Sequence, residues 1–261
     1  MKKLRQTLLA LACAAATGGA GAHDTWFEVH PASAVRLALG TGNQFPAFET
    51  GIDASYLSRQ GCRRSDAAGT VAPMAPAGQA TAALMLRVPA DAATCWAQLS
   101  ESQIELPPAK IEVYLREMQA SAELRATWAE MAARGVKWVE RYTKHARVEL
   151  GLAAPAPVPM GMDMIVETSA GATAPLCVGD TVRVRVLRDG QPLAGLAVEW
   201  RSDASRLGLW HRTDAEGRFE MKLPIAGQSL LRGIDLRLSA TERDVWVSRF
   251  MTLSLHVLPR S

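Results

Sequence analysis

The carboxyl-terminal part of the chain alternates apolar and polar residues with a period of two. Residues 182–186 read Val-Arg-Val-Arg-Val, and residues 253–257 read Leu-Ser-Leu-His-Val. A period of two predicts strands with one buried side and one outward side. Turn signals such as Asp189-Gly190 and the Thr-Asp-Ala-Glu-Gly run at 213–217 separate these stretches. Residues 160–261 are therefore predicted to form a β-sandwich.

The segment 23–106 shows the same kind of pattern in shorter runs. Apolar stretches at 35–39, 83–88 and 95–99 are separated by residues that favour turns, Gly and Pro among them. This spacing predicts an N-terminal β domain over 23–106.

The period changes after Pro107-Pro108. Apolar residues then recur three or four positions apart, which predicts helices over 107–150. Ser121 is placed to cap a second helical piece and Gly135 to end it. The Trp and Tyr residues of this stretch are interpreted as an apolar face packed on a sheet. The helical positions are Ile111, Tyr114, Leu115, Met118, Leu124, Trp128, Met131, Trp138, Val139 and Tyr142.

Residues 151–159 are rich in Ala and Pro and are predicted to form an extended linker. The predicted fold class is mainly β, with two Ig-like or β-sandwich domains and an inserted helical segment.

Residues 1–22 resemble a signal peptide. Lys2, Lys3 and Arg5 precede a short apolar run, and Ala20-Gly-Ala22 supplies the small residues of a cleavage site. Cleavage after Ala22 would make His23 the first residue of the mature chain. Cleavage after Ala16 is the alternative. A lipoprotein site at Cys13 is disfavoured, because Ala10 stands where a leucine is wanted.

Charge and hydropathy narrow the possible partners. The formal net charge of +3 equals the three basic residues of the leader, so the mature chain is close to neutral. This balance gives no indication of nucleic-acid binding, which requires a concentrated basic surface. After the leader, no apolar run approaches the roughly 20 residues of a membrane span. Export without a membrane span predicts a periplasmic protein.

Three cysteines follow the leader. In an oxidising compartment they allow one disulfide and leave one thiol. Cys62 and Cys95 fall in the same predicted domain and are the favoured pair. Cys177 precedes a strand-like run and is expected to be unpaired and buried.

A mature chain that begins at His23 would offer a metal ion both an α-amine and an imidazole. The amine is weakly basic, with a pKa of about 8, so a metal ion can displace its proton. Copper and nickel favour nitrogen donors of this kind. Asp24 would add an oxygen ligand, and His30 and His211 are further candidate ligands. If residues 23–30 form a straight strand, His23 and His30 point to opposite faces.

The remaining donors have simpler interpretations. His145 is expected to end a helix, and His256 to face solvent on the last strand. Met160, Met162 and Met164 share one face of an extended segment, which suits monovalent copper. Burial of three flexible side chains at the start of a strand is the favoured interpretation of this run.

Four motifs follow one another along the chain. They are Ala22-His-Asp-x-Trp26, Tyr142-Thr-Lys144, the run from Gly179 to Gly195 with Thr213–Phe219, and Trp246-Val-Ser248 with Thr252–Leu255. Together they resemble a bacterial periplasmic family of unknown function that is often labelled the periplasmic component of a cobalt or nickel transport system. Related sequences tend to carry a histidine after the Leu230-Leu231 strand, where this chain has Asp235. A site that used that histidine would have to use Asp235 here, or be absent.

The resemblance implies a metal-handling periplasmic protein that is not an enzyme, with a transporter in the inner membrane as its partner. The expected function is therefore binding of nickel, cobalt or copper for uptake, delivery or buffering. A copper monooxygenase with a histidine brace at the N-terminus is one alternative, and it requires a second imidazole beside His23. A scaffold or adhesion sandwich without metal is another. Hydrolase, metalloprotease and phosphate-loop motifs are absent from the sequence.

Overall fold

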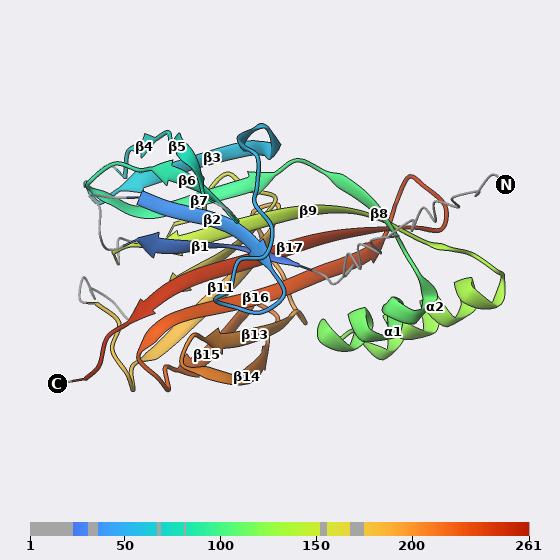
Figure 1. The fold of residues 1–261 in the computed structure, drawn as a ribbon. Helices are drawn as coiled ribbons and strands as arrows, with labels where there is room; N and C mark the ends of the chain where they lie inside the picture. Colours follow the sequence, from blue (N-terminus) through green and yellow to red (C-terminus); the bar gives the residue numbers. More distant parts are fainter. Residues whose placement is uncertain are drawn as a thin grey trace, which may run out of the picture.

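The computed structural model describes residues 23–30, 36–66, 69–80, 82–151, 156–167 and 175–260. The predicted leader, residues 1–22, lies outside this part of the chain. The protein is mainly β, as predicted, and its sheets stack face to face in a sandwich-like arrangement (Figure 1).

Three sheets form within the described residues. The first has the strand order β1-β2-β6-β5. Its strands are β1 (Asp24–His30), β2 (Arg36–Gly42), β5 (Ala75–Ala80) and β6 (Ala83–Arg87). The second has the order β10-β11-β12, with β15 also paired to β11. Its strands are β10 (Met162–Glu167), β11 (Thr181–Arg188), β12 (Gln191–Pro192) and β15 (Arg218–Lys222).

The third sheet has nine strands and lies between the other two. Its order is β14-β13-β16-β17-β9-β7-β3-β4, and β8 pairs with the first half of β9. Its strands are β3 (Leu57–Arg64), β4 (Val71–Ala72), β7 (Ala92–Leu99), β8 (Ser102–Leu106), β9 (Trp138–Glu149), β13 (Ala197–Ser202), β14 (Ser205–Arg212), β16 (Gly227–Leu238) and β17 (Val245–Val257). The 3₁₀ helix η1 (Ala54–Tyr56) precedes β3.

Strands from both predicted β regions belong to this central sheet. They are joined through β9, which lies in the predicted helical segment. Strand β9 pairs with β7 on one side and runs parallel to β17 on the other, with Val245 opposite Val139 and Ser254 opposite Val148. The two predicted β regions therefore belong to one hydrogen-bonded sheet.

The predicted helical segment is correct only in its first part. Helices α1 (Pro108–Glu117) and α2 (Ala122–Ala133) are present, and the Ser121 hydroxyl accepts a hydrogen bond from the Leu124 amide at 3.2 Å. Gly135 follows α2 with φ of 74°, a conformation that favours glycine at a helix end. Residues 138–149, however, form strand β9. Trp138 and Tyr142 are four apart, a spacing that fits one side of a strand as well as a helix.

Other local predictions are confirmed. Asp189 and Gly190 both have positive φ and join β11 to β12, as a two-residue hairpin turn requires. On β11, Val182, Val184 and Val186 are buried in the core between the central and second sheets.

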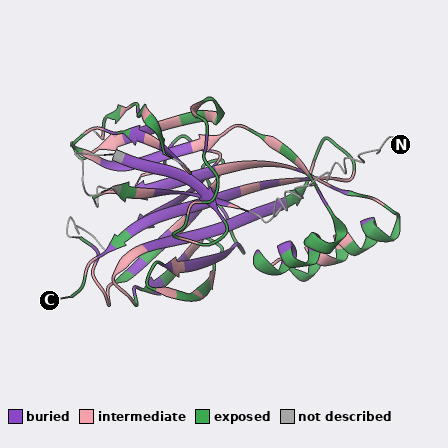
Figure 2. Cartoon of the chain, in the orientation of Figure 1, coloured by how far each residue is buried: buried purple, intermediate pink, exposed green. Residues whose placement is uncertain are grey.

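Three apolar clusters hold the layers together, and buried residues run along the long central strands (Figure 2). One lies between the second and central sheets, and includes Met160, Met162 and Met164. A second lies between the first sheet and the strands β3, β7 and β9. The third lies under α1 and α2, at the other end of β9, β16 and β17 (Figure 1).

The structure joins Cys62 of β3 to Cys95 of β7 by a disulfide, and both are fully buried. This is the pair that the sequence favours. Cys177 is free but only partly buried, because it lies beside the end of the chain, where its backbone bridges to Leu258. Among the described residues, no helix is both long and apolar enough to cross a membrane.

Candidate functional site

A cleft of about 1000 Å³ opens on one face of the central sheet. The side chains of β9 alternate between the two faces of this sheet. On the first face, Trp138 packs under the helices, whereas Ala146 and Val148 pack under the first sheet. Tyr142 and Lys144 lie between these two covers and form part of the cleft floor. The cleft therefore exists because two separate layers cover the same face of the sheet and leave a gap.

Four segments surround this floor. The segment 43–47 that follows β2 forms one wall, and α1 contributes Lys110 and Val113 to another. A third side is closed by the turn between β13 and β14, at Asp203 and Ala204, and by the first two residues of β14. His23, directly before β1, also lines the cleft.

The imidazole of His23 faces a carboxylate. Its Nε2 lies 3.4 Å from Oε2 of Glu49, and both side chains are partly exposed. Asn43 donates two hydrogen bonds to Glu49, from its backbone N at 3.1 Å and from Nδ2 at 2.8 Å. These bonds fix the orientation of the carboxylate toward His23.

Glycines bring Glu49 to this position by letting the chain fold back over β2. A Cβ at Gly40 would lie 2.3 Å from the ring of Phe48, and one at Gly42 would lie 2.4 Å from the carbonyl oxygen of Ala47. The ring of Trp26 packs against that of Phe48, with centroids 5.0 Å apart. Larger residues at either glycine would displace the segment that carries Glu49.

Asp24 forms an ion pair with an arginine. Its carboxylate is buried and lies 3.1 Å from Nε of Arg232, which is buried as well. Arg232 also lies 3.6 Å from Glu199, and Glu199 in turn lies 2.9 Å from Nε of Arg201. Asp24 is thus neutralised within a charge network, and it is not a free oxygen ligand beside His23.

The other two predicted ligands lie elsewhere. The backbone of His30 ends β1, opposite Arg36, and seven residues of strand span roughly 20 Å. His211 lies on β14 opposite the core residue Val198, so it faces the second sheet rather than the cleft. Its ring stacks on Phe219 with centroids 5.1 Å apart, and burial lowers the pKa of His211. The structure therefore does not bring His23, Asp24, His30 and His211 together.

His145 is on a strand and not at a helix end. It is buried on the second face of β9, and its Nδ1 donates to the carbonyl of Phe250 at 3.0 Å. Burial lowers its pKa to about 4. His256 is exposed, as predicted. Asp235 forms ion pairs with Arg188 and with Arg237, so its carboxylate is already used in a cluster of charged side chains.

Met160, Met162 and Met164 are buried among the apolar residues of the core. The favoured interpretation of this run, that it fills the start of a strand, is confirmed.

A buried carboxylate lies below the cleft. Glu140 accepts hydrogen bonds from the Tyr114 hydroxyl at 2.9 Å, from Trp138 Nε1 at 2.8 Å and from the Ser248 hydroxyl. Burial raises the pKa of Glu140, although each of these hydrogen bonds opposes the shift. Since the donors come from α1, β9 and β17, the interaction fixes the helical wall of the cleft to its floor.

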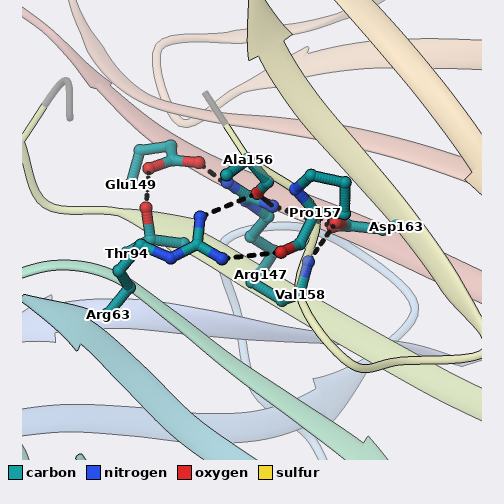
Figure 3. A network of polar contacts seen from close by, with 8 residues as sticks. All are labelled: Arg63, Thr94, Arg147, Glu149, Ala156, Pro157, Val158 and Asp163. Atoms are coloured by element: carbon teal, nitrogen blue, oxygen red, sulfur yellow. Dashed lines mark hydrogen bonds and ion pairs between the residues drawn. The ribbon is translucent and has the colours of Figure 1, made fainter. Parts of the chain in front are cut away.

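A second ionic network lies on the other face of β9 (Figure 3). Arg147 is buried and lies 2.7 Å from Glu149 and 3.0 Å from Asp163. Arg63 and Arg147 both donate to the carbonyl of Ala156, at 3.0 and 3.3 Å. The end of the predicted linker is therefore packed against β3, β9 and β10. Residues 152–155 of the linker lie outside the described part of the chain.

The family model called Domain of unknown function (DUF4198) matches residues 20–233 of this chain. The match covers most of the sequence. The chain belongs to this family. No curated protein matches it closely enough to count as a relative.

The DUF4198 match spans His23, Glu49, Lys144 and Arg232, and ends before β17. Within the part of this DUF4198 protein that the structure describes, no three His, Cys, Asp or Glu side chains form a group able to hold a metal ion. Sequence reasoning found His23 through the cleavage pattern. It missed Glu49, because only the fold-back of residues 43–50 brings that carboxylate to His23.

Proposed function

We infer that the mature protein is a periplasmic binding protein for a transition-metal ion, nickel, cobalt or copper, held at His23. The observation that carries this proposal is the position of the His23 imidazole, at the edge of a cleft and 3.4 Å from an oriented carboxylate. Imidazole and carboxylate are both ligands for these metals.

The third donor is the α-amine that cleavage after Ala22 would create. It belongs to His23 itself, so it can bind the same ion as the imidazole. With Glu49 the set becomes two nitrogens and one oxygen, and water or a partner can complete the coordination. The two hydrogen bonds from Asn43 to Glu49 act as the outer contacts that orient metal ligands.

The periplasmic location is proposed from the leader pattern and agrees with the buried disulfide, since such bonds persist in oxidising compartments. Delivery of the ion to a transporter in the inner membrane belongs to the same proposal. The net charge of the mature chain is close to zero, so it gives no indication that nucleic acid takes part in this role.

The histidine-brace alternative gains no specific support. It requires a second imidazole beside His23. Among the described residues, His145 lies on the second face of β9, His211 faces the second sheet and His256 is near the far end of β17. The backbone of His30 is at the other end of β1.

Calorimetric titration of correctly processed protein with Ni²⁺, Co²⁺ and Cu²⁺ tests the proposal. We expect one site, at least 100-fold weaker binding in His23→Ala, and at least tenfold weaker binding in Glu49→Gln, because each variant loses a donor. His256→Ala is the matched control, since it removes an exposed imidazole far from the cleft. Equal affinities in His23→Ala and the control would refute the site and favour a protein without metal.

A further inference from the structure

The floor of the cleft carries a cation without a partner. Lys144 is partly buried on β9, and in the described part of the protein its ammonium makes no hydrogen bond or ion pair. Its Nζ lies 5.7 Å from the ring centre of Tyr142 and 5.9 Å from that of Phe250. Burial lowers the pKa of Lys144 to about 8, an effect that Asp24 partly opposes. The lysine therefore stays charged at neutral pH, and the desolvation of its ammonium has a free-energy cost that a bound anion would offset.

The neighbouring charges are already matched. Arg232 lies against Asp24 and Glu199, and Arg201 lies against Glu199. Glu140 receives three hydrogen bonds and is turned toward α1. The rim of the cleft carries exposed groups of both signs, namely Lys110, Arg206, Glu117 and Asp203. On the floor, Lys144 is the cation that the pairs above leave unmatched among the described residues.

Apolar as well as polar side chains surround this lysine. Phe45, Ile104 and Val113 line the walls, and Phe250 lies on the floor. The volume of about 1000 Å³ is far larger than a metal ion or phosphate needs, and it matches the upper range of small-molecule sites. Such sites combine apolar side chains, which hold the body of the ligand, with polar groups that orient it.

We propose that the cleft binds a small organic acid whose carboxylate pairs with Lys144 and whose apolar body lies against Phe45, Val113 and Phe250. This proposal is independent of the metal at His23. A carboxylate at Lys144 would form a charge-assisted hydrogen bond in a partly dry site, where such bonds are strong. The rings of Tyr142 and Phe250 keep the ammonium in place, so little side-chain conformational freedom is lost on binding.

Three probes separate the contributions of charge and apolar surface. 2-Naphthoate has an apolar body and a carboxylate, 2-naphthamide has the same body without charge, and inorganic phosphate has charge without the body. Ligand-observed NMR titrations with the mature protein give each dissociation constant. We expect 2-naphthoate to bind and 2-naphthamide to bind at least tenfold more weakly. Phosphate should show no saturable binding below about 10 mM, because weaker contacts than this are non-specific.

Lys144→Met tests the named residue. Methionine retains the apolar stem, so we expect thermal unfolding close to that of the wild type and at least tenfold weaker binding of 2-naphthoate. Lys137→Met is the matched control, because Lys137 is exposed and pairs with Glu105. The titrations use metal-free protein, so binding of 2-naphthoate is measured without a contribution from the proposed metal site at His23.

Several results would overturn the proposal. These are no binding of 2-naphthoate, equal binding of 2-naphthamide, saturable binding of phosphate, or equal loss of 2-naphthoate binding in Lys144→Met and Lys137→Met.

Discussion

Single side chains of this protein owe their chemistry to the face of the strand on which they lie. Lys144 and His145 are neighbours in sequence, yet Lys144 lines the cleft and His145 is buried on the opposite face, beside Gly161 and Arg249. Burial lowers both pKa values, to about 8 and to about 4 respectively. Because side chains alternate along a strand, Lys144 is an accessible cation whereas the ring of His145 is neutral at physiological pH.

His145 should make stability depend on pH. Its pKa falls from 6.5 in the unfolded chain to about 4 in the folded protein, mainly because of burial. The unfolded state therefore binds the extra proton first, and stability falls as pH decreases from about 6.5 to about 4. The loss from this residue is about 3 kcal/mol.

Urea unfolding of the wild type and His145→Asn across this range measures the effect. Asparagine can still donate to the Phe250 carbonyl, but it does not titrate. We expect the difference in unfolding free energy between the two proteins to change by about 3 kcal/mol over this pH range. In His256→Asn, which replaces an exposed histidine, the difference should stay constant. An equally constant difference in His145→Asn would show that the ring is accessible.

Whole elements were predicted well where the pattern is local. The strand at 182–186, the Asp189-Gly190 turn and the Ser121 cap all follow from neighbouring residues, and all are present. The strand β9 was predicted as a helix, because its apolar spacing fits both periods. Its identity depends on pairing with β7 and β8 on one side and with β17, more than 100 residues later, on the other, which a local pattern cannot show. Lys144 reaches the cleft through this pairing.

Buried charged side chains hold the end of the predicted linker against the neighbouring strands. We expect Arg147→Met to lower the free energy of unfolding by about 3–5 kcal/mol, because Glu149 and Asp163 would remain buried without their cation. Arg183→Met is the control. The pair of Arg183 and Glu220 is half exposed, so its loss should cost at most about 1 kcal/mol. Urea unfolding of both variants measures the two losses of unfolding free energy. Similar losses would mean that the buried network adds little to stability.

The whole molecule is organised around the central sheet. Composition and periodicity were sufficient to predict its β class, but not the sharing of one sheet by segments on both sides of the linker. The cleft is also a property of the whole molecule, because its walls come from the segment 43–47 after β2, from α1 and from the β13–β14 turn. Glu49 and His23 meet through long-range packing, so the sequence offered no signal for that pair.

The disulfide acts at this scale as well. Cys62 and Cys95 are 33 residues apart and lie in the core below the first sheet. The double variant Cys62→Ala/Cys95→Ala should lose about 3–4 kcal/mol of unfolding free energy in the chain-entropy model. Cys177→Ala should lose little. Chemical denaturation of the oxidised proteins checks both, and an unchanged double variant would contradict a stabilising bridge.

The central claim, a metal site built from the first residue of the mature chain, is tested most directly by a pair of proteins that differ by one residue. One begins at His23 and the other carries a single glycine before it. The glycine converts the α-amine of His23 into an amide while leaving the imidazole and Glu49 in place. Calorimetry with Cu²⁺ and Ni²⁺ should show one site in the first protein and at least 100-fold weaker binding in the second, more than the tenfold to 100-fold typical of outer contacts. Equal affinities would contradict the account, because a site that tolerates the glycine does not use the terminal amine.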